Sequence, residues 1–109
     1  MDRRRALLVE QLLLIETELR LQGWWALSPP APEALASPEP FCVDTLEFEQ
    51  WLQWICVPRM AALLESAAPL PGSSGIQAMA EVVFRERMTQ ARPLVALLGE
   101  FDRLLQERP

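Results

Sequence analysis

The sequence predicts an all-α fold, namely a single up-and-down four-helix bundle with a kinked second helix and a proline-rich strap between the first and second helices. Apolar residues recur at helical spacing along several leucine-rich segments, and no segment shows the alternation that is typical of a strand. Prolines and glycines gather at a few points that separate these segments. The chain has 109 residues, half of them hydrophobic, so residues 1–109 are expected to form one domain with its own core.

The first helix is expected to begin at Asp2, which is a suitable cap, and to run to about Leu21 before it ends at Gly23. Its apolar residues form a wide stripe, which predicts contact with two neighbouring helices rather than one. The stripe consists of Leu8, Leu12, Ile15 and Leu19, widened by Leu7, Leu14 and Leu21.

A proline-rich stretch from Ser28 to Pro40 follows the first helix. Its prolines disfavour regular helix and favour extended geometry. One interpretation is a ligand for a proline-recognising groove. The favoured interpretation is a strap across the bundle, because prolines alone carry little motif specificity. The side chains expected to pin the strap are Trp24, Trp25, Leu35 and Phe41.

The second helix is expected to open at Asp44, with Glu47 at the reciprocal position of a capping box, and to continue toward Leu64. Pro58 lies inside it. A proline cannot donate a hydrogen bond to the Trp54 carbonyl and clashes with it, so we expect a kink or a break there. A turn follows at 69–75, through Pro71 and Gly72.

Two further helices complete the predicted bundle. The third spans about Ile76 to Met88, and a break or bend is expected from Thr89 to Pro93. The fourth runs from near Pro93 to Gln106 and has the clearest amphipathic pattern in the chain.

Composition disfavours several functional classes. The chain has no histidine and no lysine, its net charge is −5 and its pI is about 4.7. The usual general base, the lysine nucleophile and histidine metal ligands are therefore missing, and we predict no enzyme activity, no cofactor and no metal. An acidic chain with scattered arginines also disfavours direct nucleic-acid binding. Glu10 and Glu16 interrupt the most apolar stretch, which predicts no membrane span and a cytoplasmic location. We expect Cys42 and Cys56 to be reduced and to act as small hydrophobes.

Arg59 is the candidate functional residue whose position is most unusual. Helical counting from Phe48 through Leu52 and Ile55 places it on the core stripe. A buried arginine needs a carboxylate, so one interpretation is an ion pair that fixes helix register. The alternative is an anion anchor beside Trp51 or Trp54. The carboxylates considered as partners are Glu16, Glu81, Glu100 and Asp102.

The two tryptophans of this helix also admit two interpretations. Glu47, Trp51 and Trp54 fall at positions i, i+4 and i+7, so they share one face of a regular helix. Such a stripe is typical of core or strap contacts. An exposed stripe would instead indicate a docking surface for another protein.

With these residues in view, the chain resembles the YqcC-like family of small bacterial proteins. The matching residues run from Pro40-Phe41 through Asp44-Thr45, Glu47, Trp51-Leu52-Gln53-Trp54, Pro58-Arg59-Met60 and Leu63-Leu64 to Pro69-Leu70-Pro71-Gly72. The resemblance implies an all-helical up-and-down bundle and an uncharacterised function. It also implies a genomic neighbourhood shared with tRNA pseudouridine synthase C. The synthase itself needs a larger mixed α/β domain, so the chain is not expected to be that enzyme.

Two functions remain as predictions. The first is a non-enzymatic interaction module, with a tRNA pseudouridine synthase as the expected partner, because an acidic protein complements a basic RNA-binding enzyme. The second is a small-ligand binding bundle that holds an anionic or planar metabolite between an aromatic wall and Arg59. Self-association through uncovered apolar surface is also open.

Overall fold

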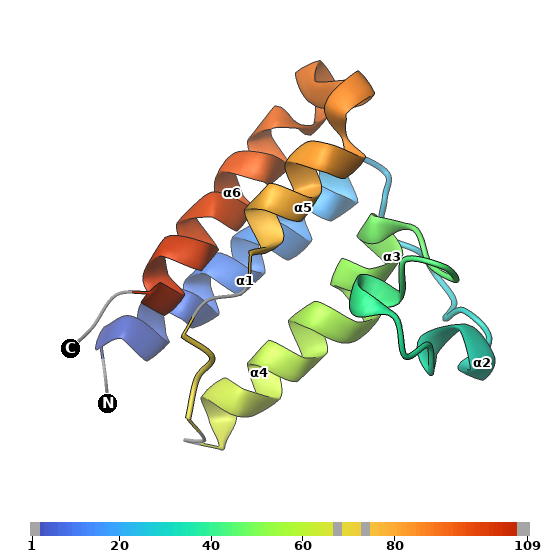
Figure 1. Cartoon of the computed structure of the whole chain (residues 1–109). Coiled ribbons are helices and arrows are strands. Elements are labelled where there is room, and N and C mark those ends of the chain that lie inside the picture. The colour runs from blue at the N-terminus through green and yellow to red at the C-terminus, as the bar shows by residue number, and fades with distance from the viewer. Residues whose placement is uncertain (1–2, 67–68, 73–74, 107–109) are drawn as a thin grey trace.

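The computed structural model describes residues 3–66, 69–72 and 75–106, and within these ranges all regular structure is helical (Figure 1). The elements in chain order are α1 (Arg3–Leu21), α2 (Pro32–Leu35), a 3₁₀ turn (Pro40–Cys42), α3 (Phe48–Trp51), a π-helical turn (Leu52–Cys56), α4 (Val57–Glu65), α5 (Ile76–Val83), a 3₁₀ turn (Arg85–Arg87) and α6 (Met88–Gln106). The segment from α3 through α4 is the predicted second helix, and with α1, α5 and α6 it confirms the four-helix bundle.

The helices pack in an up-and-down order around one core. α1 lies against both α6 and α4, and α5 lies against α6 (Figure 1). Two hydrogen bonds show that α1 is antiparallel to its neighbours: Arg4 Nη1 donates to the Leu105 carbonyl at 3.3 Å, and Arg5 Nη1 donates to the Leu63 carbonyl at 3.2 Å. The predicted α1 stripe is buried at Leu8, Leu12, Ile15 and Leu19.

α1 ends in a Schellman motif, as the glycine after it predicted. Gly23 has a φ of 76° and its N–H donates to the Arg20 carbonyl, while the Trp24 N–H donates to the Leu19 carbonyl at 2.9 Å. Only glycine adopts this left-handed φ without strain. The predicted cap Asp2 lies outside the described residues. Leu14 and Leu21, expected to widen the buried stripe, are 44% and 76% exposed, so α1 keeps an apolar side without cover.

The strap lies beside the start of the second helix (Figure 1), and aromatic rings anchor the chain at both of its ends. Trp24 stacks on the fully buried Phe84, with 5.1 Å between ring centroids. Phe41 packs against Trp51 at 4.8 Å and against Phe48 at 6.2 Å. The strap is less extended than expected, because α2 forms one helical turn within it. Pro32 stands at the first turn of α2, where its missing N–H has no helical partner to lose.

The cap of the second helix differs from the predicted one. Glu47 is the N-cap, and Gln50 completes the capping box by accepting a hydrogen bond from the Glu47 N–H at 2.8 Å. Asp44 instead accepts a hydrogen bond from Ser37 Oγ and so braces the strap. The helix starts later than predicted because the chain first turns through residues 42–46, where the Leu46 N–H donates to the Cys42 carbonyl at 2.8 Å.

The irregularity predicted at Pro58 takes the form of a π-helical turn just before it. The Val57 N–H donates to the Leu52 carbonyl, five residues back, instead of to the Gln53 carbonyl. The wider turn accommodates Pro58, which has no N–H to donate to the Trp54 carbonyl. The one extra residue in this turn rotates the side chains of the following helix, α4, by about 100° about the helix axis relative to a regular α-helix. This rotation decides where Arg59 points.

The C-terminal hairpin also departs from prediction. The break lies at Phe84–Arg87 rather than at 89–93, because the chain leaves α5 where Phe84 enters the core. Pro93 therefore lies inside α6, and the carbonyl that it leaves without a helical donor belongs to Thr89, an exposed residue. The start of α5 at Ile76 is confirmed, following Gly75 with a φ of 64°. Asp102 caps it by accepting a hydrogen bond from the Gln77 N–H at 2.8 Å.

The turn before α5 is described only in part. Pro71 and Gly72 lie outside regular structure, as predicted, while Ser73 and Ser74 are not among the described residues. Leu70 of the same segment packs against the core.

Candidate functional site

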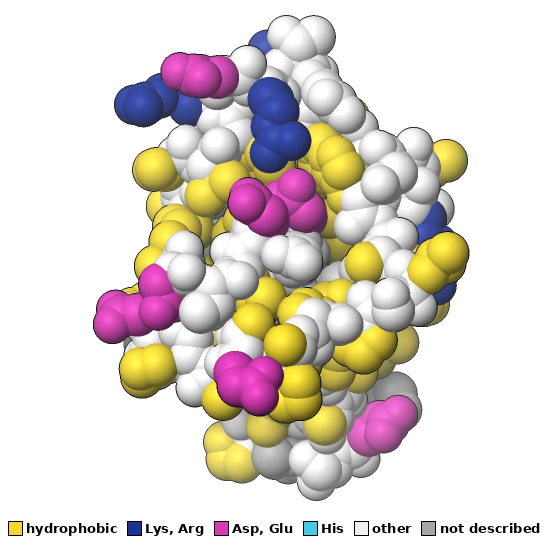
Figure 2. Space-filling model, turned by 90° about the vertical axis from the view of Figure 1, so that its right-hand side faces the viewer, with side chains coloured by type: hydrophobic (Ala, Val, Ile, Leu, Met, Phe, Trp, Pro, Cys, Tyr) yellow, Lys and Arg dark blue, Asp and Glu magenta, His cyan; other side chains and the backbone are white. Residues whose placement is uncertain are grey.

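The predicted candidates Trp51 and Arg59 lie on one side of the second helix and, with Ile55 between them, face the strap. Together with the strap they enclose a groove of about 360 Å³, which we call the strap groove. Figure 2 views the molecule from the side of Figure 1 on which α2 and α3 lie, and it shows hydrophobic patches with acidic side chains standing between them. The strap residues that line the groove are Leu35, Ser37, Glu39, Pro40, Phe41 and Cys42.

The backbone of the strap is strained where it borders this groove. Phe41 and Cys42 have φ values of 58° and 49°, in the left-handed region that non-glycine residues seldom adopt. Strain of this kind persists only where surrounding contacts impose it. Here those contacts are the Phe41–Trp51 ring contact and the burial of Cys42, which is 5% exposed. The groove wall is therefore fixed by packing.

Arg59 is exposed, and within the described residues it makes no hydrogen bond or ion pair. This finding contradicts the interpretation of Arg59 as a buried ion-pair member. The carboxylates considered for it have other roles: Glu16 pairs with Arg20, Glu100 pairs with Arg103, and Asp102 caps α5. Glu81 is exposed on α5.

The π-helical turn explains this outcome. Regular helical counting placed Ile55 and Arg59 on the core stripe, but the buried stripe runs through Phe48, Leu52 and Cys56 and continues to the partly buried Met60. The extra residue in the turn moves Arg59 off the core side and onto the wall of the strap groove. The guanidinium there is available to an anion.

Trp54 lies in a different groove from Trp51, so the two tryptophans do not form one aromatic wall. Trp54 lines a groove of about 430 Å³ between α1 and the second helix, together with Trp25, Arg20 and Pro58. The Arg20 guanidinium lies over the Trp25 ring at 4.5 Å. The indole Nε1 of Trp54 is buried without an acceptor among the described residues. The expectation that Glu47, Trp51 and Trp54 share one face is wrong, because the π-helical turn separates Trp51 from Trp54.

Gln53, in the same segment, has a role that sequence reasoning missed, whereas Cys56 is a free, buried cysteine, as predicted. Gln53 is 4% exposed and clamps the chain between α1 and the strap, accepting a hydrogen bond from the Ala26 N–H and donating one to the Ala26 carbonyl, both at 2.8 Å. A polar glutamine beside tryptophans did not indicate, from the sequence, that its side chain would be buried. Cys56 lies in the core, and burial raises the pKa of its thiol from 9.0 to about 12, although Arg59 nearby lowers it. A thiol in this state is a poor nucleophile.

Neither a metal-binding cluster nor a membrane-crossing helix is present among the described residues. Histidine, cysteine and acidic side chains do not gather in groups of three or more that could hold a metal ion. No helix there has the length and apolar character that crossing a membrane requires.

Comparison with known proteins identifies the family. A family model, DUF446, described as tRNA pseudouridine synthase C, matches residues 7–104. The chain belongs to this family. Its relatives include an uncharacterised protein of Haemophilus influenzae, 46% identical over 94 residues that cover 82% of this chain and 84% of that one. Another is the uncharacterised protein YqcC of Escherichia coli, 34% identical over 97 residues and 89% of both chains.

A relative with a solved structure has the same fold. The solution NMR structure of YqcC from Escherichia coli matches with a TM-score of 0.87 at 30% identity, and the match covers 99% of this chain and 92% of that one. The resemblance to YqcC-like proteins and the all-α fold are thereby confirmed.

One further relative is much longer than this chain. The tRNA pseudouridine synthase C of Pectobacterium carotovorum is 48% identical over 64 residues, which are 59% of this chain but only 17% of that protein. Most of that protein therefore lies outside the match.

Proposed function

We propose that this chain is a non-enzymatic accessory module that binds tRNA pseudouridine synthase C. The observation that carries the proposal is the Pectobacterium protein: a segment 48% identical to this chain makes up 17% of a protein named as that synthase. Where one organism has two segments joined in one protein, the corresponding segments of another organism are often separate proteins that bind each other. This chain would be one of the two, and the rest of the synthase the other. Such a role would place the chain in the cytoplasm, where tRNA is modified.

Charge supports the same partner. The chain has a net charge of −5, and an enzyme that binds tRNA presents basic surface to the phosphates. Opposite charge speeds association and favours the correct partner over other acidic proteins. Several carboxylates of the bundle are engaged in structural contacts, such as the Glu49–Arg87 pair at 3.9 Å and the cap made by Asp102, which favours a binding role over acid–base catalysis.

The decisive experiment mixes this chain with the tRNA pseudouridine synthase C of the organism that encodes it. We expect one complex in size-exclusion chromatography and a dissociation constant of about 1 µM or below by calorimetry, measured at about 0.15 M salt so that loose charge attraction is screened. A pseudouridine synthase of another family, equally basic, is the control and should not bind. Separate elution of the two proteins at concentrations of about 10 µM would contradict the proposal.

A second function is favoured by the strap groove, which combines an aromatic wall with an unpaired cation. Trp51 and Phe41 line the groove beside Arg59, and Arg59 has no partner among the described residues. An aromatic wall with an adjacent guanidinium suits a planar anion. The groove volume of about 360 Å³ lies within the range of small-molecule sites, about 300–1,000 Å³.

Substitution of Arg59 tests this second function. We expect Arg59→Leu to change the free energy of unfolding by less than about 0.5 kcal/mol, because the side chain is exposed and unpaired. Binding of the planar anion anilinonaphthalene sulfonate, followed by fluorescence, should weaken by about tenfold. Arg92→Leu, at another exposed arginine, is the matched control. Equal binding by wild type and both variants would remove the strap groove as an anion site.

A further inference from the structure

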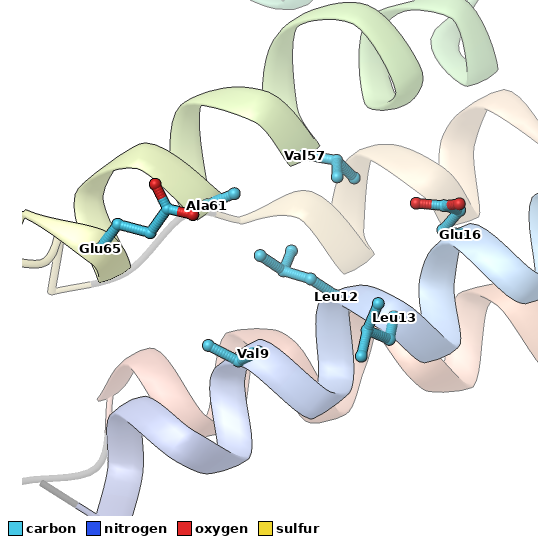
Figure 3. Close-up of a pocket in the computed structure, with 7 residues that line it drawn as sticks. All are labelled: Val9, Leu12, Leu13, Glu16, Val57, Ala61 and Glu65. Atoms are coloured by element: carbon cyan, nitrogen blue, oxygen red, sulfur yellow. The ribbon is translucent and has the colours of Figure 1, made fainter. Parts of the chain in front are cut away.

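A second groove runs between α1 and the second helix and is more apolar than the strap groove. One part is lined by Val9, Leu12, Leu13 and Glu16 of α1 and by Val57, Ala61 and Glu65 of α4, with a volume of about 250 Å³ (Figure 3). The other part is the groove that holds Trp54 and Trp25. Glu16 and Val57 line both parts, so the two hollows adjoin one another, and we call them together the α1–α4 groove.

The walls of this groove are held in place by hydrogen bonds within the chain. Arg5 of α1 donates to the Leu63 carbonyl of α4 at one end. At the other end Gln53 of the second helix makes two hydrogen bonds to Ala26, just after the end of α1. These bonds brace the antiparallel helices at both ends, so a ligand meets a preformed site and little ordering cost arises on binding.

Apolar side chains along the groove are left open to solvent. Leu13 is 61% exposed and Val9 is 46% exposed on the α1 wall, and Leu27 at the tryptophan end is fully exposed. Leu12 forms part of the floor at 6% exposure and, with Val57, points into the space between the helices (Figure 3). A monomeric protein seldom leaves apolar residues aligned in one groove, and such a line marks a contact surface.

The spacing of the wall residues fits a helix as the occupant. On α1 the lining residues Val9, Leu13, Glu16 and Arg20 follow one another at intervals of four, three and four. On the second helix the lining residues Trp54, Val57, Ala61 and Glu65 follow at three, four and four. Two helical stripes facing one groove present ridges between which a third helix packs. From Val9 to Arg20 the groove is about 17 Å long, or about three helical turns.

The charges around the groove favour a helix from a basic protein as the occupant. Glu65 stands at one end of the groove without an ion pair among the described residues, while Glu16 in the middle is already paired with Arg20 at 3.0 Å. A second copy of this chain would bring a further net charge of −5 to the contact, and like charges disfavour such an encounter. A helix from a basic partner, with a cation near Glu65, removes this repulsion.

We propose that the α1–α4 groove binds one amphipathic helix of tRNA pseudouridine synthase C. The helix places apolar residues at i, i+3 or i+4 and i+7 into the groove and an arginine or lysine beside Glu65. This inference rests on the proposed function, because it names the surface through which that complex forms.

The test compares two chemically identical substitutions on α1. Leu13→Arg places a cation in the middle of the groove, whereas Leu21→Arg alters a residue that is 76% exposed and lies outside it. In calorimetry with the synthase, Leu13→Arg should weaken binding by at least about tenfold, and Leu21→Arg should stay within about twofold of wild type. Leu13→Gln serves as a second variant, without added charge, and should weaken binding in the same direction.

Each outcome decides the matter. If wild type and both arginine variants bind equally well, the complex exists but the groove is not its site, and this inference alone fails. If both variants weaken binding equally, general charge is responsible and the groove is again overturned. If wild type does not bind, the proposed function and this inference fail together. A photo-cross-linker at Leu13 should attach to a synthase helix; attachment to a second copy of this chain would overturn the inference in favour of a dimer.

Discussion

Phe84→Ala should lower the free energy of unfolding by about 3–5 kcal/mol, which is a large part of the stability of a domain of this size. Phe84 is fully buried at the end of α5, where it stacks on Trp24 and meets Phe48 edge-on at 5.8 Å. Its ring therefore joins the C-terminal hairpin, the end of α1 and the second helix. Truncation leaves a cavity at the meeting point of three elements, which none of them can fill by moving alone.

Urea denaturation followed by circular dichroism measures this loss. Val82→Ala is the matched control, because Val82 lies two residues earlier in α5 and is 66% exposed, so its free energy of unfolding should change by less than about 0.5 kcal/mol. A loss below about 1 kcal/mol for Phe84→Ala would mean that the aromatic junction does not stabilise the bundle.

The parts of the fold that local chemistry determines were predictable from the sequence. Gly23 is the one residue type that ends a helix in the left-handed conformation without strain, and α1 ends there. The apolar stripe of α1 identified the buried Leu8, Leu12, Ile15 and Leu19, because a regular helix repeats with a known period. These features depend on neighbours in the chain, which the sequence displays directly.

The candidate site could be predicted only in part, because its geometry depends on a single inserted residue. Pro58 indicated an irregular helix, but a proline is compatible with a kink, a break or a wider turn. The structure has the wider turn, and it places Arg59 and Trp51 in one groove and Trp54 in another. Choosing among those forms requires the tertiary contacts of Cys56 and Gln53, which helical counting does not contain.

The α1–α4 groove could not be predicted from the sequence either, because it also depends on tertiary contacts. Val9 and Leu13 lie outside the stripe predicted for α1, and a helical pattern does not show that they line a groove beside α4. The sequence-based prediction of a stripe with two neighbours is correct for the buried residues. That prediction does not indicate that a side of α1 remains uncovered by the rest of the chain.

Alkaline pH should destabilise the protein through one thiol. Burial raises the pKa of Cys56 to about 12 in the folded chain, whereas an unfolded cysteine titrates at about 8.5. Above pH 9 the unfolded chain loses this proton while the folded chain keeps it, so the unfolded state binds fewer protons and stability falls as pH rises. The stabilisation by the neutral thiol is fully present at pH values below the pKa of the unfolded chain. It is lost as the pH rises toward the pKa of the folded chain.

The composition makes this effect easy to isolate. The chain has no histidine, lysine or tyrosine, so the side chains that most often titrate between pH 6 and pH 11 in other proteins do not contribute to the pH dependence. In a Cys42→Ala background, the free energy of unfolding should be nearly constant from pH 6 to pH 8. From about pH 9 to pH 11 it should fall by about 1.4 kcal/mol per pH unit, the slope expected for one proton.

The double variant Cys42→Ala/Cys56→Ala supplies the control. It should be less stable at pH 7, because truncation of a side chain that is 5% exposed leaves a cavity, yet its stability should no longer depend on pH above 9. A slope that persists in the double variant would assign the alkaline loss to a group other than Cys56. Urea titrations at fixed pH values give both the slope and the intercept, so the cavity and the proton are measured separately. The π-helical turn connects the two, because it is this turn that puts Cys56, rather than Ile55, into the core.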